Sequence, residues 1–156
     1  MNAEVCPVEQ RYAPGVSPSN FVGVMMAYLK KSGCDYVWAN TGFHNAFFNL
    51  KRSLVQHPEY LFLMQEIGFF YVAPNHFSED LESALTELQM ARIIAYVNPE
   101  FQKIEITLPQ GGIQDFIDSQ IDGILSKRKD FKKEDISHTC EALARHLTEI
   151  GTSARS

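Results

Sequence analysis

The stretch that most constrains the fold is residues 78–108, which reads as a helix followed directly by a β-hairpin. Ser78 precedes Glu79 and Asp80. This order is typical of a helix N-terminus, because the serine hydroxyl accepts backbone N–H groups and the carboxylates suit the positive end of the helix dipole. Four apolar residues then recur at helical spacing: Leu81, Ala84, Leu85 and Leu88. The stretch therefore predicts an amphipathic helix that ends near Arg92 and packs on a core.

Two β-rich runs follow this helix, residues 93–97 and 101–108, with Asn98, Pro99 and Glu100 between them. Short β-prone runs separated by turn-forming residues are typical of an antiparallel hairpin. We expect a hairpin that turns at residues 98–100.

Local capping residues predict two helices before this stretch. Ser17 and Pro18 are suited to the N-cap and first position of a helix, and Gly33 is suited to end it. Thr41 can cap a second helix, which must end before Pro58 because the residue ahead of a proline avoids the helical region.

The remaining segments differ in how clearly they can be assigned. Residues 35–39 are β-prone, and residues 60–77 fit either a strand or a short helix with a tight turn. Two apolar stripes predict the final helices, residues 113–125 and 136–150. Both stripes are wide, so we expect these helices to pack on each other and leave a face for a second copy or a partner.

Length and composition are those of one domain. The chain has 156 residues, of which 45% are hydrophobic, enough for a single core. We expect a flexible N-terminal arm at residues 1–16, one domain with a C-terminal helical extension at residues 17–151, and a tail at residues 152–156. The predicted fold class is α+β and helix-rich.

The same composition bears on compartment and partners. The chain has no run of eighteen apolar residues, and its N-terminus lacks the basic and apolar regions of a signal peptide. Cys6, Cys34 and Cys140 are odd in number and scattered, which argues against a disulfide framework. These features favour a cytoplasmic protein that does not bind a membrane.

The helix and hairpin pattern resembles the recognition helix and wing of bacterial winged-helix proteins. The resemblance covers about residues 42–126 and rests on the leucine and alanine spacing from Leu81, the Ile93-Ile94 pair, and a strand ending Ile104-Glu105-Ile106-Thr107. It includes PadR-like regulators and antitoxins or adaptors of the SocA (Panacea) type. It implies a winged-helix-like domain with a hairpin wing and two further helices. These families usually have glycine where this chain has Arg92, because the helix there ends in a left-handed residue.

Charge decides between the functions that such a fold could have. The net charge is −5, and the helix starting at Ser78 carries four carboxylates against Arg92 alone: Glu79, Asp80, Glu82 and Glu87. A DNA-reading helix would place such carboxylates against phosphates. The leading hypothesis is therefore a non-enzymatic adaptor or regulator that acts through protein contacts, with a homo-oligomer included. The alternative is a DNA-binding transcription regulator, and an enzyme of unrecognised class is the weakest of the three.

Two clusters are candidate partner-binding sites. One is basic and lies between the last two predicted helices: Lys127, Arg128, Lys129, Lys132 and Lys133. It could bind an acidic surface or phosphates, or it could be a solvated loop. The other is aromatic and comprises Phe69, Phe70 and Tyr71, with Phe77 nearby. These rings could anchor a protein partner or fill the core.

The histidines and cysteines give no recognisable site. Cys34 with His44, or His138 with Cys140, could form a nucleophile pair or metal ligands, but ordinary core thiols and surface imidazoles are the favoured interpretation. No phosphate-binding, dinucleotide-binding, nucleophile-elbow or zinc-protease motif occurs. We therefore expect no catalytic residues, no metal and no cofactor.

Overall fold

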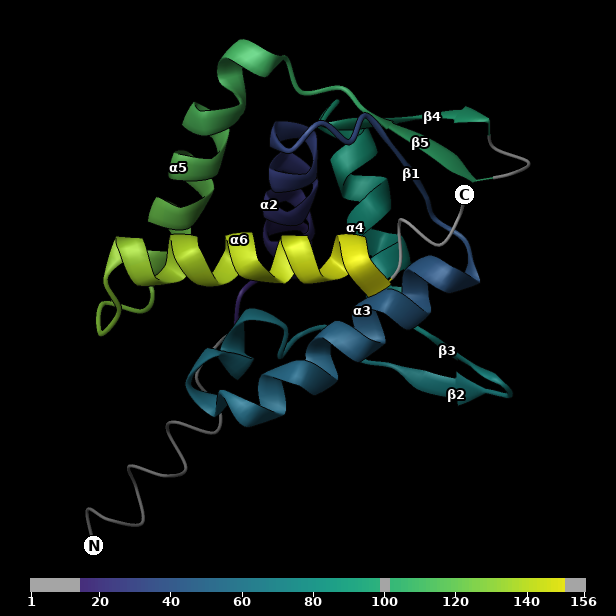
Figure 1. The fold of residues 1–156 in the computed structure, drawn as a ribbon, viewed down its shortest axis with the longest axis horizontal. Helices are drawn as coiled ribbons and strands as arrows, with labels where there is room; N and C mark the ends of the chain where they lie inside the picture. Colours follow the sequence, from purple (N-terminus) through teal and green to yellow (C-terminus); the bar gives the residue numbers. More distant parts are fainter. Residues whose placement is uncertain (1–14, 99–101, 151–156) are drawn as a thin grey trace, which may run out of the picture.

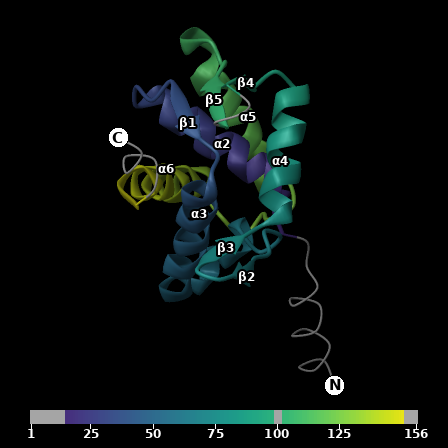
Figure 2. The same ribbon diagram turned by 90° about the vertical axis from the view of Figure 1, so that its right-hand side faces the viewer.

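The computed structural model describes residues 15–98 and 102–150 and confirms an α+β protein (Figures 1 and 2). The helices and strands follow one another as α2 (Pro18–Lys31), β1 (Tyr36–Trp38), α3 (Thr41–Ser53), η1 (Leu54–Gln56), η2 (Pro58–Leu63), β2 (Phe70–Val72), β3 (Asn75–Phe77), α4 (Glu79–Met90), β4 (Ile94–Asn98), β5 (Lys103–Ile106), η4 (Gln110–Gly112), α5 (Ile113–Leu125) and α6 (Lys133–Ile150). None of the helices in these ranges is long and apolar enough to cross a membrane.

Helix α2 lies at the centre of the molecule, with α4, α5 and α6 packed around it (Figure 1). Its position follows from its sequence, since residues 21–29 are all buried and leave no polar face in the middle of the helix. As predicted, Ser17 caps its start and accepts the Asn20 N–H, and Gly33 follows its end with φ 102°. Local chemistry thus sets both ends of the central helix.

Two small antiparallel sheets lie one in the upper and one in the lower part of the molecule in both ribbon views (Figures 1 and 2). The first has the order β1-β5-β4, so the predicted β-prone segment at residues 35–39 joins the predicted hairpin as a third strand. The turn expected at residues 98–100 lies largely outside the described residues. The second sheet is the hairpin β2-β3, inserted between α3 and α4. Residues 60–77, ambiguous in sequence, therefore contain both a 3₁₀ helix and a hairpin.

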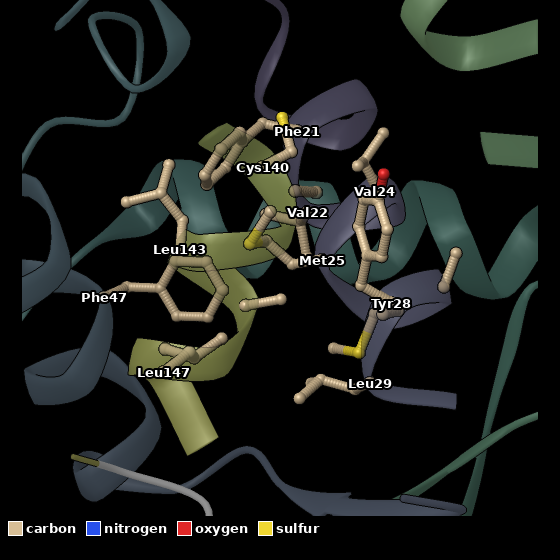
Figure 3. Packing of buried hydrophobic residues seen from close by; sticks show 14 of the residues in the cluster. Phe21, Val22, Val24, Met25, Tyr28, Leu29, Phe47, Cys140, Leu143 and Leu147 are labelled. Carbon is tan, nitrogen blue, oxygen red and sulfur yellow. The ribbon is translucent and has the colours of Figure 1, made fainter. Parts of the chain in front are cut away.

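The core is formed where α2, α3 and α6 meet (Figure 3). Phe47 of α3 faces Leu143 and Leu147 of α6, and all three are buried. Cys140 is also in this core, and its burial raises the pKa of the thiol to about 12. Burial likewise raises the pKa of the Tyr28 hydroxyl to about 12. A thiol with such a pKa stays protonated at neutral pH, which fits the prediction of a core cysteine.

Two sequence-based expectations need correction. The apolar stripes of α5 and α6 do not leave a face for a partner, because within the described residues the chain itself buries them, largely against α2. Val16, the last residue of the arm expected at residues 1–16, is not part of a loose segment, since it is buried and its N–H donates to the Phe62 carbonyl oxygen at 3.2 Å. Residues 1–14 and 151–156 lie outside the described ranges.

Helix α4 is followed by a left-handed residue. Arg92 has φ 64°, its N–H donates to the Gln89 carbonyl, and the Ile93 N–H donates to the Leu88 carbonyl. This pair of hydrogen bonds forms a Schellman motif, which usually places glycine at the left-handed position. Arginine is strained there because its Cβ approaches the following carbonyl.

Replacing Arg92 with glycine is therefore expected to raise the free energy of unfolding, by about 0.5–1 kcal/mol. The Arg92 side chain is exposed, so its loss removes no buried contact. Urea denaturation at neutral pH measures the change. Arg52→Gly is the matched control, because Arg52 lies within α3 and glycine there should destabilise. An Arg92→Gly variant less stable than the wild type would show that the side chain contributes more than the strain costs.

Candidate functional site

Within residues 15–98 and 102–150, the one run of consecutive exposed large apolar residues lies on strand β2. Phe70, Tyr71 and Val72 have exposed fractions of 48%, 62% and 56%, and they are consecutive. We call these three residues the β2 patch. The sequence predicts that the aromatic cluster either anchors a partner or fills the core, and the structure gives a different answer for different residues. Phe69 is half-buried and packs against the core, whereas Phe70 and Tyr71 are exposed and do not fill it. Phe70 and Val72 point to one face of the hairpin and Tyr71 to the other, so β2 exposes apolar side chains on both faces. Exposed apolar side chains gathered in this way are typical of an interaction surface.

Helix α3 holds the hairpin by the outer edge of β3. The Asn45 side chain accepts the backbone N–H of His76 at 2.9 Å, and its amide nitrogen donates to the Asn75 side chain at 2.8 Å. Figure 1 shows β3 between α3 and β2. The Asn45 side chain therefore occupies the edge of β3 at which a further strand could pair. β2 is then the outer strand of the hairpin.

Stacked rings reinforce this attachment on the α3 side of the hairpin. Phe48 of α3 stacks on His76 with ring centroids 3.5 Å apart, and Phe48 also meets Phe69 edge-on at 5.5 Å. Across the hairpin, Tyr71 lies 5.1 Å from His76, and Phe70 lies 5.5 Å from Phe77. Each exposed ring of β2 thus rests on a ring of β3 that is itself packed on α3. Such support holds the β2 patch in one orientation, which lowers the entropy cost of binding.

His44 links α3 to the start of α4. It is buried, with an exposed fraction of 2%, rather than a surface imidazole. Its Nδ1 accepts the Ser78 N–H at 3.1 Å, so the proton must be on Nε2, which donates to Glu82 at 2.8 Å. The ring also stacks on Phe77 at 4.4 Å. Both ring nitrogens are therefore occupied by protein groups, and the His44–Glu82 pair has a structural arrangement rather than that of a free catalytic dyad.

The base of the hairpin is bonded by two charged side chains, each to a backbone group. Lys51 donates to the Ile67 carbonyl at 2.7 Å, and Asp80 accepts the Gly68 N–H at 2.8 Å. Burial lowers the pKa of Lys51, while the nearby Asp80 and Glu66 carboxylates oppose this shift. These contacts fix the backbone between the end of η2 and the start of β2. The charged groups therefore hold the base of the hairpin in place.

The predicted basic cluster is less available than its sequence implies. Lys133 lies in α6 and contacts Asp122 and Asp118 of α5 at 3.1 and 3.9 Å. Its hydrogen bond to Asp122 raises the pKa of Lys133. Arg128 lies over the Phe62 ring at 4.2 Å and contacts Asp130 at 3.4 Å. Three of the five cations remain exposed on this side: Lys127, Lys129 and Lys132. The cluster therefore offers a much weaker positive surface than five lysines and arginines within residues 127–133 suggest.

The other histidines and cysteines do not assemble into a recognisable centre. Cys34 donates to the Tyr36 carbonyl oxygen. His138 and His146 line a surface cavity of about 550 Å³ with His57, between α6 and the end of α3. Within residues 15–98 and 102–150, no group of three or more histidine, cysteine or acidic side chains is placed to hold a metal ion.

The exposed side of α4 is acidic, as the sequence pattern indicates. Glu79, Asp80 and Glu87 are exposed, whereas the predicted apolar stripe is buried, with Leu85 at 0% exposure. Glu82 is partly covered through its contact with His44. No basic residue lies in the last turn of this helix. Duplex DNA would therefore meet carboxylates on this face.

Comparisons with known proteins do not add a relative. Scans against protein-family models, curated proteins and solved structures found no match.

Proposed function

We propose that this chain is a non-enzymatic adaptor or regulatory protein, and that it acts through protein contacts made by the β2 patch. The observation that carries the proposal is the combination of exposure and support at β2. Phe70 and Tyr71 are exposed, yet each packs on a ring of β3, and Asn45 bonds β3 to α3. Rigid exposed aromatic side chains are the residues that contribute most to protein interfaces.

The scaffold proposed for this role is winged-helix-like. Three observations support it: the order α2, β1, α3, α4, β4, β5, the three-stranded order β1-β5-β4, and the left-handed Arg92 between α4 and β4. In this scaffold α4 takes the place of the recognition helix and β4-β5 that of the wing. The β2-β3 hairpin is then an insertion ahead of α4. An inserted, exposed and well-supported element is a natural place for a function specific to this chain.

The charge distribution favours a protein partner over DNA. The outer face of α4 is acidic, and α5 and Asp130 contact two of the five clustered cations. Phosphate contacts need available lysine and arginine side chains, because affinity for DNA comes largely from counterion release. A protein partner has no such requirement.

Capture experiments with the full chain test the proposal. Tagged wild-type protein and a Phe70→Ser/Tyr71→Ser variant are incubated with lysate of the native host, and bound proteins are quantified by mass spectrometry. We expect at least one specifically bound protein to bind the variant about 30-fold more weakly than it binds the wild type. This loss is typical of an aromatic hot spot. Val55→Ser/Met90→Ser is the matched control, since these two exposed apolar residues lie on η1 and α4.

Two results would contradict the proposal. The first is equal capture of every bound protein by the wild type and the hairpin variant. The second is sub-micromolar binding of duplex DNA at about 150 mM salt, abolished by Thr86→Ala and Gln89→Ala on the exposed side of α4. The second result would establish the DNA-binding regulator instead.

A further inference from the structure

The backbone of β2 presents an unpaired edge whose geometry follows from its register. Tyr71 lies opposite His76, and the His76 N–H points away from β2 because it donates to Asn45. Opposite residues in an antiparallel pair share one type of pairing, so Tyr71 also directs its N–H and C=O outward, on the other edge. Within the described residues the sheet has only these two strands, so no strand covers that edge.

The edge lacks the charges with which proteins usually protect exposed strands. Residues 68–77 contain no lysine, arginine, aspartate or glutamate. Natural edge strands are commonly blocked by such charges, by proline or by covering segments. Because the whole chain carries a net charge of −5, two copies repel each other over most of their surface. The uncharged hairpin is therefore a place where two copies can approach without a like-charge penalty.

We propose that a second copy of this chain occupies this edge, with β2 pairing antiparallel to β2 of the partner across a two-fold axis at Tyr71. The inference rests on the proposed function and names the partner at the β2 patch. The Tyr71 N–H of each copy would donate to the Tyr71 carbonyl of the other, which satisfies both outward groups. The result is a four-stranded sheet in the order β3-β2-β2-β3.

The side chains of β2 are complementary to themselves in this arrangement. Pairing about Tyr71 places Phe70 of one copy opposite Val72 of the other, and the reverse on the far side of the axis. Aromatic residues opposite β-branched residues are among the favourable cross-strand pairs. Since the same surface meets itself, the contact closes after two copies and does not propagate. β2 has three residues, which limits the interface and gives a weak, reversible dimer.

Sedimentation velocity of the full chain from about 1 µM to about 1 mM tests the inference. We expect a monomer–dimer equilibrium in the wild type. Tyr71→Pro removes the outward N–H without removing a bond to β3, and it should weaken the dimer about 10-fold or more because both symmetric hydrogen bonds are lost. Tyr71→Thr keeps the N–H and a β-prone side chain, so it should dimerise more strongly than Tyr71→Pro.

A second variant keeps the test decisive if Tyr71→Pro disturbs the hairpin. Val72→Lys places a charge on the edge of each copy and should abolish the dimer, whereas Val55→Lys, on an exposed apolar residue outside the hairpin, should not. Circular dichroism verifies the fold of each variant. A wild type that stays monomeric throughout the range, or a dimer unchanged by both Tyr71→Pro and Val72→Lys, would overturn the inference. A monomeric wild type whose capture of a host protein still depends on Phe70 and Tyr71 would leave the proposed function standing.

Discussion

Replacing Phe47 with alanine is expected to lower the free energy of unfolding by about 3–5 kcal/mol. The Phe47 side chain is fully buried, lies 4.8 Å from the Phe43 ring, and faces Leu143 and Leu147 of α6 (Figure 3). Its removal leaves a cavity where α2, α3 and α6 meet, and the loss of stability grows with the part of this cavity that the surrounding side chains do not fill. Urea denaturation followed by circular dichroism measures the loss, provided that the slope against urea is unchanged.

Phe70→Ala is the matched control, because the same atoms are removed from an exposed position. Its cost should be less than about 1 kcal/mol, since it loses mainly the contact with the Phe77 ring. Similar losses in the two variants would mean that Phe70 is covered in solution. Such a result at high protein concentration alone would agree with the dimer inferred above.

His44→Ala is expected to cost about 2–4 kcal/mol, the largest effect among the polar side chains discussed above. The variant leaves the buried Ser78 N–H without its acceptor, and it removes the ring that stacks on Phe77. An unsatisfied buried donor contributes about 1–3 kcal/mol of this loss, and the stacking contributes the rest. Thermal and urea denaturation should agree on the value.

Glu82→Gln tests the hydrogen bond at Nε2 of His44 separately from the one at Nδ1. Glutamine keeps an oxygen that accepts the His44 Nε2–H, and the Glu82 side chain is 41% exposed, so the change should cost less than about 1 kcal/mol. A loss as large as that of His44→Ala would instead assign most of the energy to the negative charge of Glu82.

Elements defined by local chemistry could be predicted from the sequence. Ser17 and Ser78 cap helices as expected, and Gly33 follows the end of α2, because each acts on backbone groups within a few residues. Even here a near neighbour can substitute. Asn40, rather than Thr41, caps α3, with its side chain accepting the Gly42 and Phe43 N–H groups, and Thr41 becomes the first helical residue.

Elements that depend on distant partners could not be predicted. The β2-β3 hairpin is held by Asn45, which lies thirty residues before Asn75, so no local pattern distinguishes it from a helix. His44 accepts an N–H from Ser78, 34 residues away, and its burial has no signature in its own neighbourhood. The ion pair of Lys133 is not visible in the basic cluster itself for the same reason, because the carboxylate that contacts Lys133 belongs to the preceding helix.

The two ends of the hairpin insertion are both anchored to a single helix. Lys51 of α3 binds the Ile67 carbonyl where the insertion begins, and His44, two turns earlier in α3, binds the Ser78 N–H where it ends. The intervening residues 68–77 therefore leave and re-enter the fold at fixed points, and their own length and sequence do not set the path of α3 or α4. The hairpin can therefore be exchanged as a unit: another strand pair could be grafted between Ile67 and Ser78 while α3 and α4 keep their positions.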